Sequence, residues 1–288
     1  MLTQILFSGL ALGSIYGLVA LGFAVIFKAT GVFNFAQGML VVCGAYLAVT
    51  ASSQLGLPFP FAIVFIIVAA ALLGAVIHAL LIRPLAGRPL LPVIMITIAL
   101  AIVLRAVIEL IYGPQARALT TPLPTGSFVI GGVRISELHL TAALVCWACM
   151  GGVGAFFKFT SAGLLMRATA DSHEAALVSG INVNRINAFA WAIGSVLAAI
   201  GGVFLGQLQV ATVDLETIGL LALPAVVIGG LQSIPGAIVG GLLVGLIEQL
   251  ASGYISPKAR DILIYAPLLM ILMVRPWGLF GQRELGRV

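Results

Sequence analysis

The sequence predicts an all-helical protein that crosses a membrane eight or nine times. Of its 288 residues, 61% are hydrophobic and only 8% are charged, whereas soluble domains carry about 25% charged residues. Apolar runs of the ~20 residues that a helix needs to cross a bilayer recur near 5–27, 35–55, 60–82, 91–112, 138–157, 187–208, 217–233, 236–254 and 261–276. We expect all the spans to be helical, because lipid offers no partner to unpaired backbone groups.

The number of spans depends on the last third of the chain. The runs at 217–233 and 236–254 are joined only by Ser233 to Pro235, so they form either a tight helical hairpin or broken helices. The first run, Ile5 to Phe27, has no basic residue before it and no polar flank of the kind that is cleaved. We therefore expect it to be retained in the protein and not removed as a signal peptide. Residues 1–288 then form one transmembrane domain.

The basic residues predict the orientation, because cytoplasmic loops of membrane proteins are rich in Lys and Arg. With nine crossings and a cytoplasmic loop at about 162–186, nine basic residues lie inside and four outside, and Arg105 lies within a span. The inner set is Lys28, Arg83, Arg88, Lys158, Arg167, Arg185, Arg275, Arg283 and Arg287, and the outer set is Arg117, Arg134, Lys258 and Arg260. The N-terminus is thus expected outside and the C-terminus in the cytoplasm. The net charge of +5 follows from this topology, and nothing in it suggests nucleic-acid binding.

Small residues at four-residue spacing predict close helix packing. Gly9, Gly13 and Gly17 lie on one face of the first span, and Gly236, Gly240 and their neighbours repeat the spacing in a late span. Such faces let helix backbones approach each other in lipid. The late segment also contains Pro224 and Pro235, which forbid a continuous straight helix. Broken segments of this kind are typical of the translocation path in transporters.

The segment after the first span places two amides in apolar sequence. Asn34 and Gln37 lie among aromatic residues and glycines, and amides in hydrocarbon are costly unless they have partners or border water. We expect a helix broken at Gly31 and Gly38, with its polar turn facing the protein centre.

Few ionisable residues lie inside the spans. Arg105 and Glu109 are four residues apart and share one helix face, either as a functional site or as a structural ion pair that reaches toward the outer surface. The same two interpretations apply to Glu248 with Gln249, while His78, close to a cytoplasmic helix end, is expected at the interface.

The polar stretch from Ala162 to Arg185 interrupts an otherwise apolar chain. Asp171 followed by Glu174 resembles a capping box, and Gly180 is a natural helix stop. The stretch therefore predicts a short helix that presents an Ala-Ala-Leu tip, and an exposed apolar tip suggests a docking surface.

The three cysteines all lie inside expected spans. Cys146 and Cys149 form a C-x-x-C pair, but the chain has no second pair to complete a metal site, and Cys43 stands alone. We interpret all three as small buried hydrophobic residues and expect no metal.

Three motifs together resemble the permeases of branched-chain amino acid ABC importers, of the LivH-like type. These are VFNFAQG, RATADSHEAALVSGINVNR and GGLQSIPGAIVGG, and the match runs in order over nearly the whole chain. Gln37 stands where the family commonly has His.

The resemblance implies partners and roles. The partners are a second, related permease, two cytosolic ATPases that bind ATP and Mg, and an extracytoplasmic solute-binding protein, all at the inner membrane of a prokaryote. No cofactor is expected in this chain, which hydrolyses nothing and has no phosphate-binding loop. The coupling loop would comprise Arg167, Asp171, Glu174, Ala175, Ala176, Gly180, Ile181 and Asn182. The translocation path would be lined or gated by Asn34, Phe35, Gln37, Gly38, Gly229, Gly230, Ser233, Gly236 and Gly240.

Other functions remain to be weighed. Related permeases carry amides or urea, and the substrate depends largely on the binding protein. An ion-coupled secondary transporter would need paired carboxylates near mid-membrane, and Glu109 and Glu248 both lie toward the outer side. A membrane hydrolase would need a nucleophile beside a base, and no G-x-S-x-G motif accompanies the histidines. A passive channel has no use for a docking loop.

Overall fold

The computed structural model describes residues 2–119, 121–130, 133–256 and 259–281. Two helices carry short extensions of other helix types, η1 (Thr50–Gln54), η2 (His78–Ile82) and η3 (Arg83–Leu85). The α-helices in chain order are α1 (Leu2–Thr30), α2 (Gln37–Val49), α3 (Phe59–Ile77), α4 (Leu90–Tyr112), α5 (Glu137–Phe159), α6 (Ser161–Asp171), α7 (His173–Val178), α8 (Val183–Gln209), α9 (Leu215–Gly219), α10 (Ala222–Gly229), α11 (Ile234–Tyr254) and α12 (Arg260–Val274).

Six helices in the described part of the chain are long and apolar enough to cross a membrane by themselves: α1, α3 with its extensions, α4, α5, α8 and α11. The remaining apolar segments are shorter, namely α2 with η1, the pair α9–α10, and α12. Of the two alternatives for 217–233 and 236–254, the structure shows broken helices. The first segment forms α9 and α10, and Pro224 lies in the first turn of α10, where its missing N–H breaks no helical hydrogen bond.

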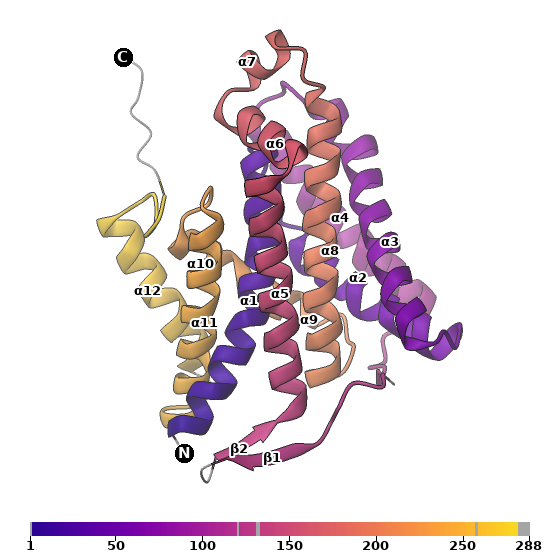
Figure 1. Ribbon diagram of the computed structural model, residues 1–288, viewed down its shortest axis with the longest axis vertical. Coiled ribbons are helices and arrows are strands. Elements are labelled where there is room, and N and C mark those ends of the chain that lie inside the picture. The colour runs from indigo at the N-terminus through magenta and orange to yellow at the C-terminus, as the bar shows by residue number, and fades with distance from the viewer. Residues whose placement is uncertain (1, 120, 131–132, 257–258, 282–288) are drawn as a thin grey trace.

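The helices run up and down between two ends of a bundle (Figure 1). One end carries the start of α1, and the other carries α6, α7 and the last turn of α12. The prediction of an all-helical chain is wrong outside the bundle, because β1 (Ser127–Ile130) and β2 (Val133–Ser136) form an antiparallel hairpin between α4 and α5. This hairpin lies beyond the end of the helices, where water satisfies the free edges of its strands.

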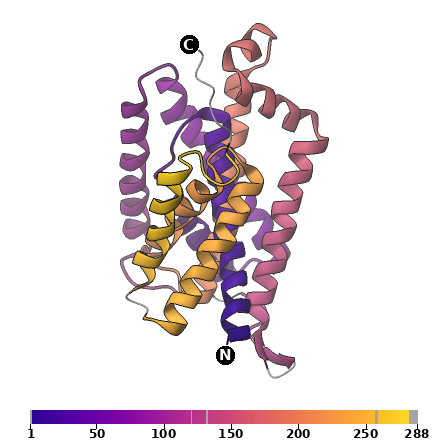
Figure 2. The same ribbon diagram turned by 90° about the vertical axis from the view of Figure 1, so that its left-hand side faces the viewer.

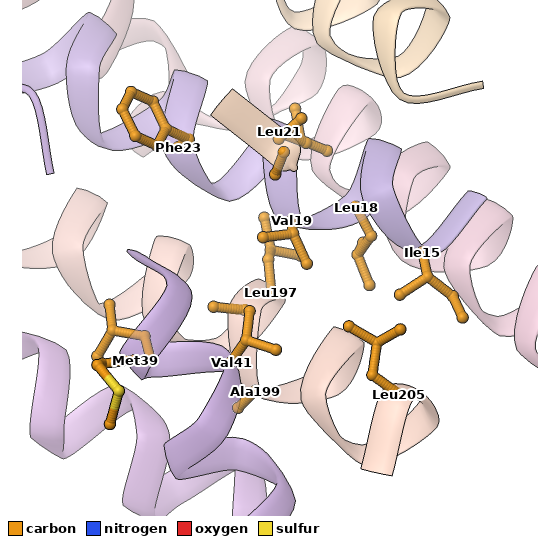
Figure 3. Packing of buried hydrophobic residues seen from close by; sticks show 14 of the residues in the cluster. Ile15, Leu18, Val19, Leu21, Phe23, Met39, Val41, Leu197, Ala199 and Leu205 are labelled. Atoms are coloured by element: carbon orange, nitrogen blue, oxygen red, sulfur yellow. The ribbon is translucent and has the colours of Figure 1, made fainter. Parts of the chain in front are cut away.

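The core is built around α1. In its apolar stretch 89% of the residues are buried, against 28% for α3 and for α4, so α1 occupies the centre and the other two lie at the periphery. The helices α10, α11 and α12 cover one side of α1, and α2, α3 and α8 lie on the other (Figures 1 and 2). Figure 3 shows Ile15 and Val19 of α1 packed with Val41 of α2 and Leu205 of α8.

Glycines bring α1 and α11 into backbone contact, as the four-residue spacing predicts. A Cβ atom added to Gly241 would lie 2.2 Å from the Cα of Gly17, and one added to Gly245 would lie 2.3 Å from the Cα of Gly13. The obstacle in both cases is backbone, which has little room to shift. Any larger residue at these positions must separate the two helices.

We predict that Gly241→Ala destabilises the protein, by about 1–3 kcal/mol as overpacking typically does. The matched control is Gly151→Ala in α5, because a Cβ added there meets no atom within 4 Å. Both changes remove a glycine from a helix interior and share the same intrinsic gain in helix propensity. Thermal unfolding of the purified protein in detergent measures the difference, and equal midpoints for the two variants would contradict the proposed contact.

Candidate functional site

The chain between α1 and α2 is broken where the sequence predicts a break. α1 ends as Gly31 takes a positive φ of +67°, a conformation that glycine adopts without strain. The Oδ1 of Asn34 accepts from the N–H of Ala36 (3.1 Å), and its Nδ2 donates to Oε1 of Gln37 (3.0 Å). The hydroxyl of Thr97 in α4 accepts a further backbone hydrogen bond from this segment (3.3 Å). The break is therefore closed by protein groups.

The second predicted break, at Gly38, is wrong. Gly38 lies inside α2, and a Cβ added to it would lie 2.6 Å from the backbone oxygen of Glu216. This glycine serves the close approach of α2 to α9 and does not interrupt the helix. Asn34 and Gln37 are themselves fully buried, with Gln37 also donating to the carbonyl of Val19 (3.4 Å).

The turn between α10 and α11 is the second predicted part of the path. Gly230 takes a φ of +108°, and Ser233 caps α11 by accepting from the N–H of Gly236 (3.1 Å). A Cβ added to Gly229 would lie 2.0 Å from the oxygen of Gly236, and one added to Gly240 would lie 1.9 Å from a backbone oxygen of α10. These glycines allow two helices to pack at backbone distance.

The structure does not bring these two groups of residues together. Gln37 packs against Gly22 on one side of α1, whereas Gly17 faces Ile238 of α11 on the other. The two groups therefore pack against different faces of α1. The assignment of Asn34, Phe35, Gln37, Gly38 and the 229–240 glycines to one path stays a prediction.

The polar loop folds into two helices that project from one end of the bundle (Figure 1). α6 begins after Thr160, whose hydroxyl accepts from the N–H of Gly163 (3.0 Å), and α7 begins after Ser172, whose hydroxyl accepts from the N–H of Ala175 (3.2 Å). The predicted start at Asp171 is wrong by one residue. Asp171 ends α6, and Ser172 takes the extended conformation that an N-cap requires.

The helix α7 stops at Gly180, as predicted. Gly180 has a φ of +77°, and its N–H donates to the carbonyl of Leu177 while the N–H of Ile181 donates to that of Ala176, both at 3.0 Å. These two bonds make a Schellman motif. Asn182 follows as the N-cap of α8, with its Oδ1 accepting from a backbone N–H of the first turn (3.2 Å). Three consecutive residues thus end one helix and start the next.

The exposed tip of this loop differs from the predicted Ala-Ala-Leu. Ala175 is exposed, but Ala176 is buried. The large apolar side chains in water are those of Leu177 and Val178, the latter 91% exposed. The sequence prediction did not include Val178 in the exposed tip. Its position beside Leu177, just before the helix stop at Gly180, is the sequence signal that could have identified it.

Two charged residues of the predicted docking set lie on the same projection. Arg167 is exposed on α6. Glu174 belongs to α7, but its side chain lies outside the described residues, so its contact with a partner stays a prediction.

The predicted pair in α4 forms and has further partners. Nε of Arg105 lies 3.0 Å from Oε1 of Glu109, and the guanidinium also lies 3.5 Å from Glu216 and 3.8 Å from Asp214. Asp214 and Glu216 are remote in sequence, which is why the pattern gave no sign of them. The cluster joins α4 to the start of α9. Because Arg105 is 43% exposed, its ion pairs contribute little to the free energy of folding.

The buried acid of α11 also has partners. The hydroxyl of Tyr16 donates to Oε2 of Glu248 (2.6 Å), and Nη1 of Arg260 donates to Oε1 (3.3 Å). Glu248 is only 5% exposed and both of its oxygens are paired, as the structural interpretation expects; a functional role stays a prediction. The arrangement ties α1, α11 and α12 together.

The cysteines lie within the spans as expected. Cys146 is buried, Cys43 and Cys149 are half-buried, and all three are free thiols. Among the described residues no group of His, Cys, Asp and Glu is arranged to hold a metal ion.

The sequence matches a known protein family. Residues 5–272 match the family model described as the branched-chain amino acid transport system permease component. The chain belongs to this branched-chain amino acid permease family. LivH of Escherichia coli K12 is 31% identical over 99% of this chain and 97% of that protein. BraD of Pseudomonas aeruginosa is 32% identical over the same shares, and the probable LivH of Methanocaldococcus jannaschii is 28% identical over 92% and 88%.

A solved structure shares the fold of this permease. PsaBC from Streptococcus pneumoniae in complex with Fab superposes with a TM-score of 0.50 at 19% identity, over 93% of this chain and 91% of that one. At this identity the likeness concerns the fold alone. The family and the apolar helices make the permease a multi-pass protein of the inner membrane.

We predict that Gln37→Leu destabilises the permease by about 1–3 kcal/mol, because it leaves the buried Nδ2 of Asn34 without an acceptor. The matched control is Gln54→Leu, since Gln54 is exposed at the end of η1. Thermal unfolding in detergent compares the two. A Gln37→Leu variant as stable as the control would show that the amide pair does not hold the break closed.

Proposed function

We propose that this permease is the membrane-spanning subunit of an ABC importer that carries branched-chain amino acids into the cytoplasm, powered by separate ATPase subunits. The observation that carries the proposal is the α6–α7 projection, which places Leu177 and Val178 in water at the tip of an otherwise lipid-embedded chain. Exposed apolar patches on ordered helices mark interaction sites. Family membership supplies the class of substrate.

The distribution of basic residues supports an orientation with α6–α7 in the cytoplasm. Of the eight or nine expected crossings, only nine puts the N-terminus and the C-terminus on opposite sides. Lys258, Arg283 and Arg287 lie outside the described residues. Of the others, the end that carries α6–α7 holds Lys28, Arg83, Arg88, Lys158, Arg167, Arg185 and Arg275, and the opposite end holds Arg117, Arg134 and Arg260. This excess favours the α6–α7 end as the cytoplasmic one, with the N-terminus outside.

The packing of α6 supplies a route for coupling. α6 contacts α1, α5 and α8, and α8 in turn packs against α1, α2 and α3. When ATP closes the ATPase dimer, a docked α7 moves and displaces α8 relative to the core. Two access states that differ in these contacts then exchange population. The chain itself supplies no chemistry to this cycle.

The assembly that follows gives each permease chain three kinds of protein partner. Two cytosolic ATPases dock on α6–α7 of two related permease chains, which sit side by side in the bilayer. A solute-binding protein delivers the amino acid at the opposite end. ATP and Mg are bound by the ATPases.

We predict that Val178→Asp abolishes ATP-dependent uptake of labelled leucine by the full complex in vesicles and releases the ATPases during purification. The physical reason is that the variant would bury an unpaired carboxylate in the apolar contact between α7 and the ATPase. This burial weakens the binding of the ATPase to the permease. The matched control is Val129→Asp in β1, at the other end of the molecule and also exposed.

Each outcome decides a separate point. Uptake that persists without ATP, or that ignores Val178→Asp, would refute the motor-driven importer and favour an ion-coupled transporter. If the intact complex carries an amide or urea in place of leucine, the importer stands and only the substrate changes. Loss of uptake in both variants would show that the effect is not specific to α7.

A further inference from the structure

A polar cavity of about 290 Å³ opens at the cytoplasmic end of the permease. It lies where the end of α1, the extensions η2 and η3 of α3, and the first turns of α8 meet. Its size is at the lower end of the ~300–1,000 Å³ range of small-molecule pockets, which suits one small solute. The proposed path and the docking projection use none of its side chains.

One wall of the cavity is cationic. Arg83 and Arg88 line it together with His78, and none of its lining residues is Asp or Glu. Guanidinium groups bind carboxylates through paired hydrogen bonds. His78 is buried and begins the π-helical turn η2. π-Helical turns inside helices often mark functional sites. This wall fits an anionic group.

A second part of the lining offers acceptors, at the end of α1 (Thr30) and at Asn187 of α8. The last carbonyls of a helix lack partners within the helix and carry partial negative charge. The Oδ1 of Asn187 is buried and accepts no hydrogen bond from any described residue, although buried polar atoms are almost always paired. This part of the lining therefore fits a cationic donor such as an ammonium group.

Apolar side chains complete the lining. Val32, Ile82 and Val93 are buried, and Leu85 adds to them. A ligand must therefore combine a carboxylate, an ammonium and a short aliphatic group. A phosphate headgroup satisfies only the cationic wall.

We propose that this cavity binds a free α-amino acid with an aliphatic side chain, taken from the cytoplasm. The carboxylate lies at Arg83 and Arg88, the ammonium at Asn187 and the end of α1, and the side chain against Val32 and Val93. The choice of amino acid rests on the proposed function, because it makes the cytoplasmic ligand the product of import.

The position of the cavity gives the bound amino acid a regulatory effect. Asn184 and Asn187 belong to the first turns of α8, directly after the Gly180–Asn182 junction with α7. A ligand that bridges these turns to η3 holds the start of α8 against α3. Because coupling needs α8 to move, accumulated product slows the transport cycle.

Equilibrium dialysis of labelled leucine tests binding, with the complex of permease and ATPases in nanodiscs, without binding protein or ATP. Leucine is expected to bind, and leucinamide and 4-methylpentanoate about tenfold more weakly or worse, since each lacks one charged group. Arg83→Gln and Arg88→Gln should each weaken leucine binding by a similar factor. Arg134→Gln, an exposed arginine of β2 at the far end, is the matched control.

The outcomes are distinct. No leucine binding, or binding that Arg83→Gln and Arg88→Gln leave unchanged, overturns the site. Binding of 4-methylpentanoate as tight as that of leucine shows a plain anion pocket and overturns the amino-acid assignment. Thermal unfolding midpoints equal to wild type establish that the variants are folded.

Transport-coupled ATPase activity tests regulation in the same complex with loaded binding protein enclosed in vesicles. Leucine added on the ATPase side should lower the wild-type rate at least about twofold, and the Arg83→Gln rate, compared with its own rate without leucine, far less. The rate of Arg275→Gln, an exposed arginine after α12 that does not line the cavity, should fall as the wild-type rate does. Unchanged wild-type rates would overturn the regulatory role. If the wild-type complex imports no leucine at all, the proposed function fails instead, whatever the dialysis shows.

Discussion

Satisfaction of backbone hydrogen bonds inside the bundle is the constraint on which the rest of this structure depends. Lipid supplies no donor or acceptor, so a break in a helix must be closed by protein groups. Asn34 and Thr97 close the break after α1, and Ser233 caps the start of α11. The carbonyls of Ile228 and Gly229 at the end of α10 accept from the N–H groups of Leu279 and Phe280 (2.8 and 2.9 Å). Each break is thus tied to a different neighbouring segment.

This constraint makes α1 the reference element of the molecule. On one side its glycines admit the backbone of α11, and on the other Gly22 lies against α8 and the amide of Gln37. Both broken segments therefore pack on a single buried helix. A displacement of α8 is felt at α1, α2 and α3 together, because packed interiors transmit strain with little compression.

Sequence reasoning succeeded where a local rule fixes the structure. Hydropathy predicted the long helices, and glycine spacing predicted close packing of α1 and of α11, though not that they contact each other. Gly31 and Gly180 end helices because of their positive φ. It failed where the outcome depends on remote residues. No residue close to Arg105 in the sequence predicts its ion pair with Asp214. The role of Gly38 depends on α9, which packs beside it only in the folded protein. The N-cap of α7 at Ser172 was missed for a local reason. Asp171 is also a residue type that caps helices, and only the backbone conformation shows that Ser172 is the cap.

The same division explains why the functional surfaces are harder to predict than the fold. The proposed docking at α7 depends on which residues of a short helix face water. Ala176 and Val178 are two residues apart, about half a helical turn, so one is buried and the other exposed. The cavity at the α6–α7 end combines Thr30, Arg83 and Asn187, which come from three distant segments, and no local pattern connects them. What connects them is the start of α8, which carries Asn187 and follows α7 after the Gly180–Asn182 junction. If α7 docks on an ATPase as proposed, α8 both receives the movement of the ATPase and lines the proposed binding cavity. The two are then coupled by thermodynamic necessity, because any ligand with different affinity for the two positions of α8 shifts their populations.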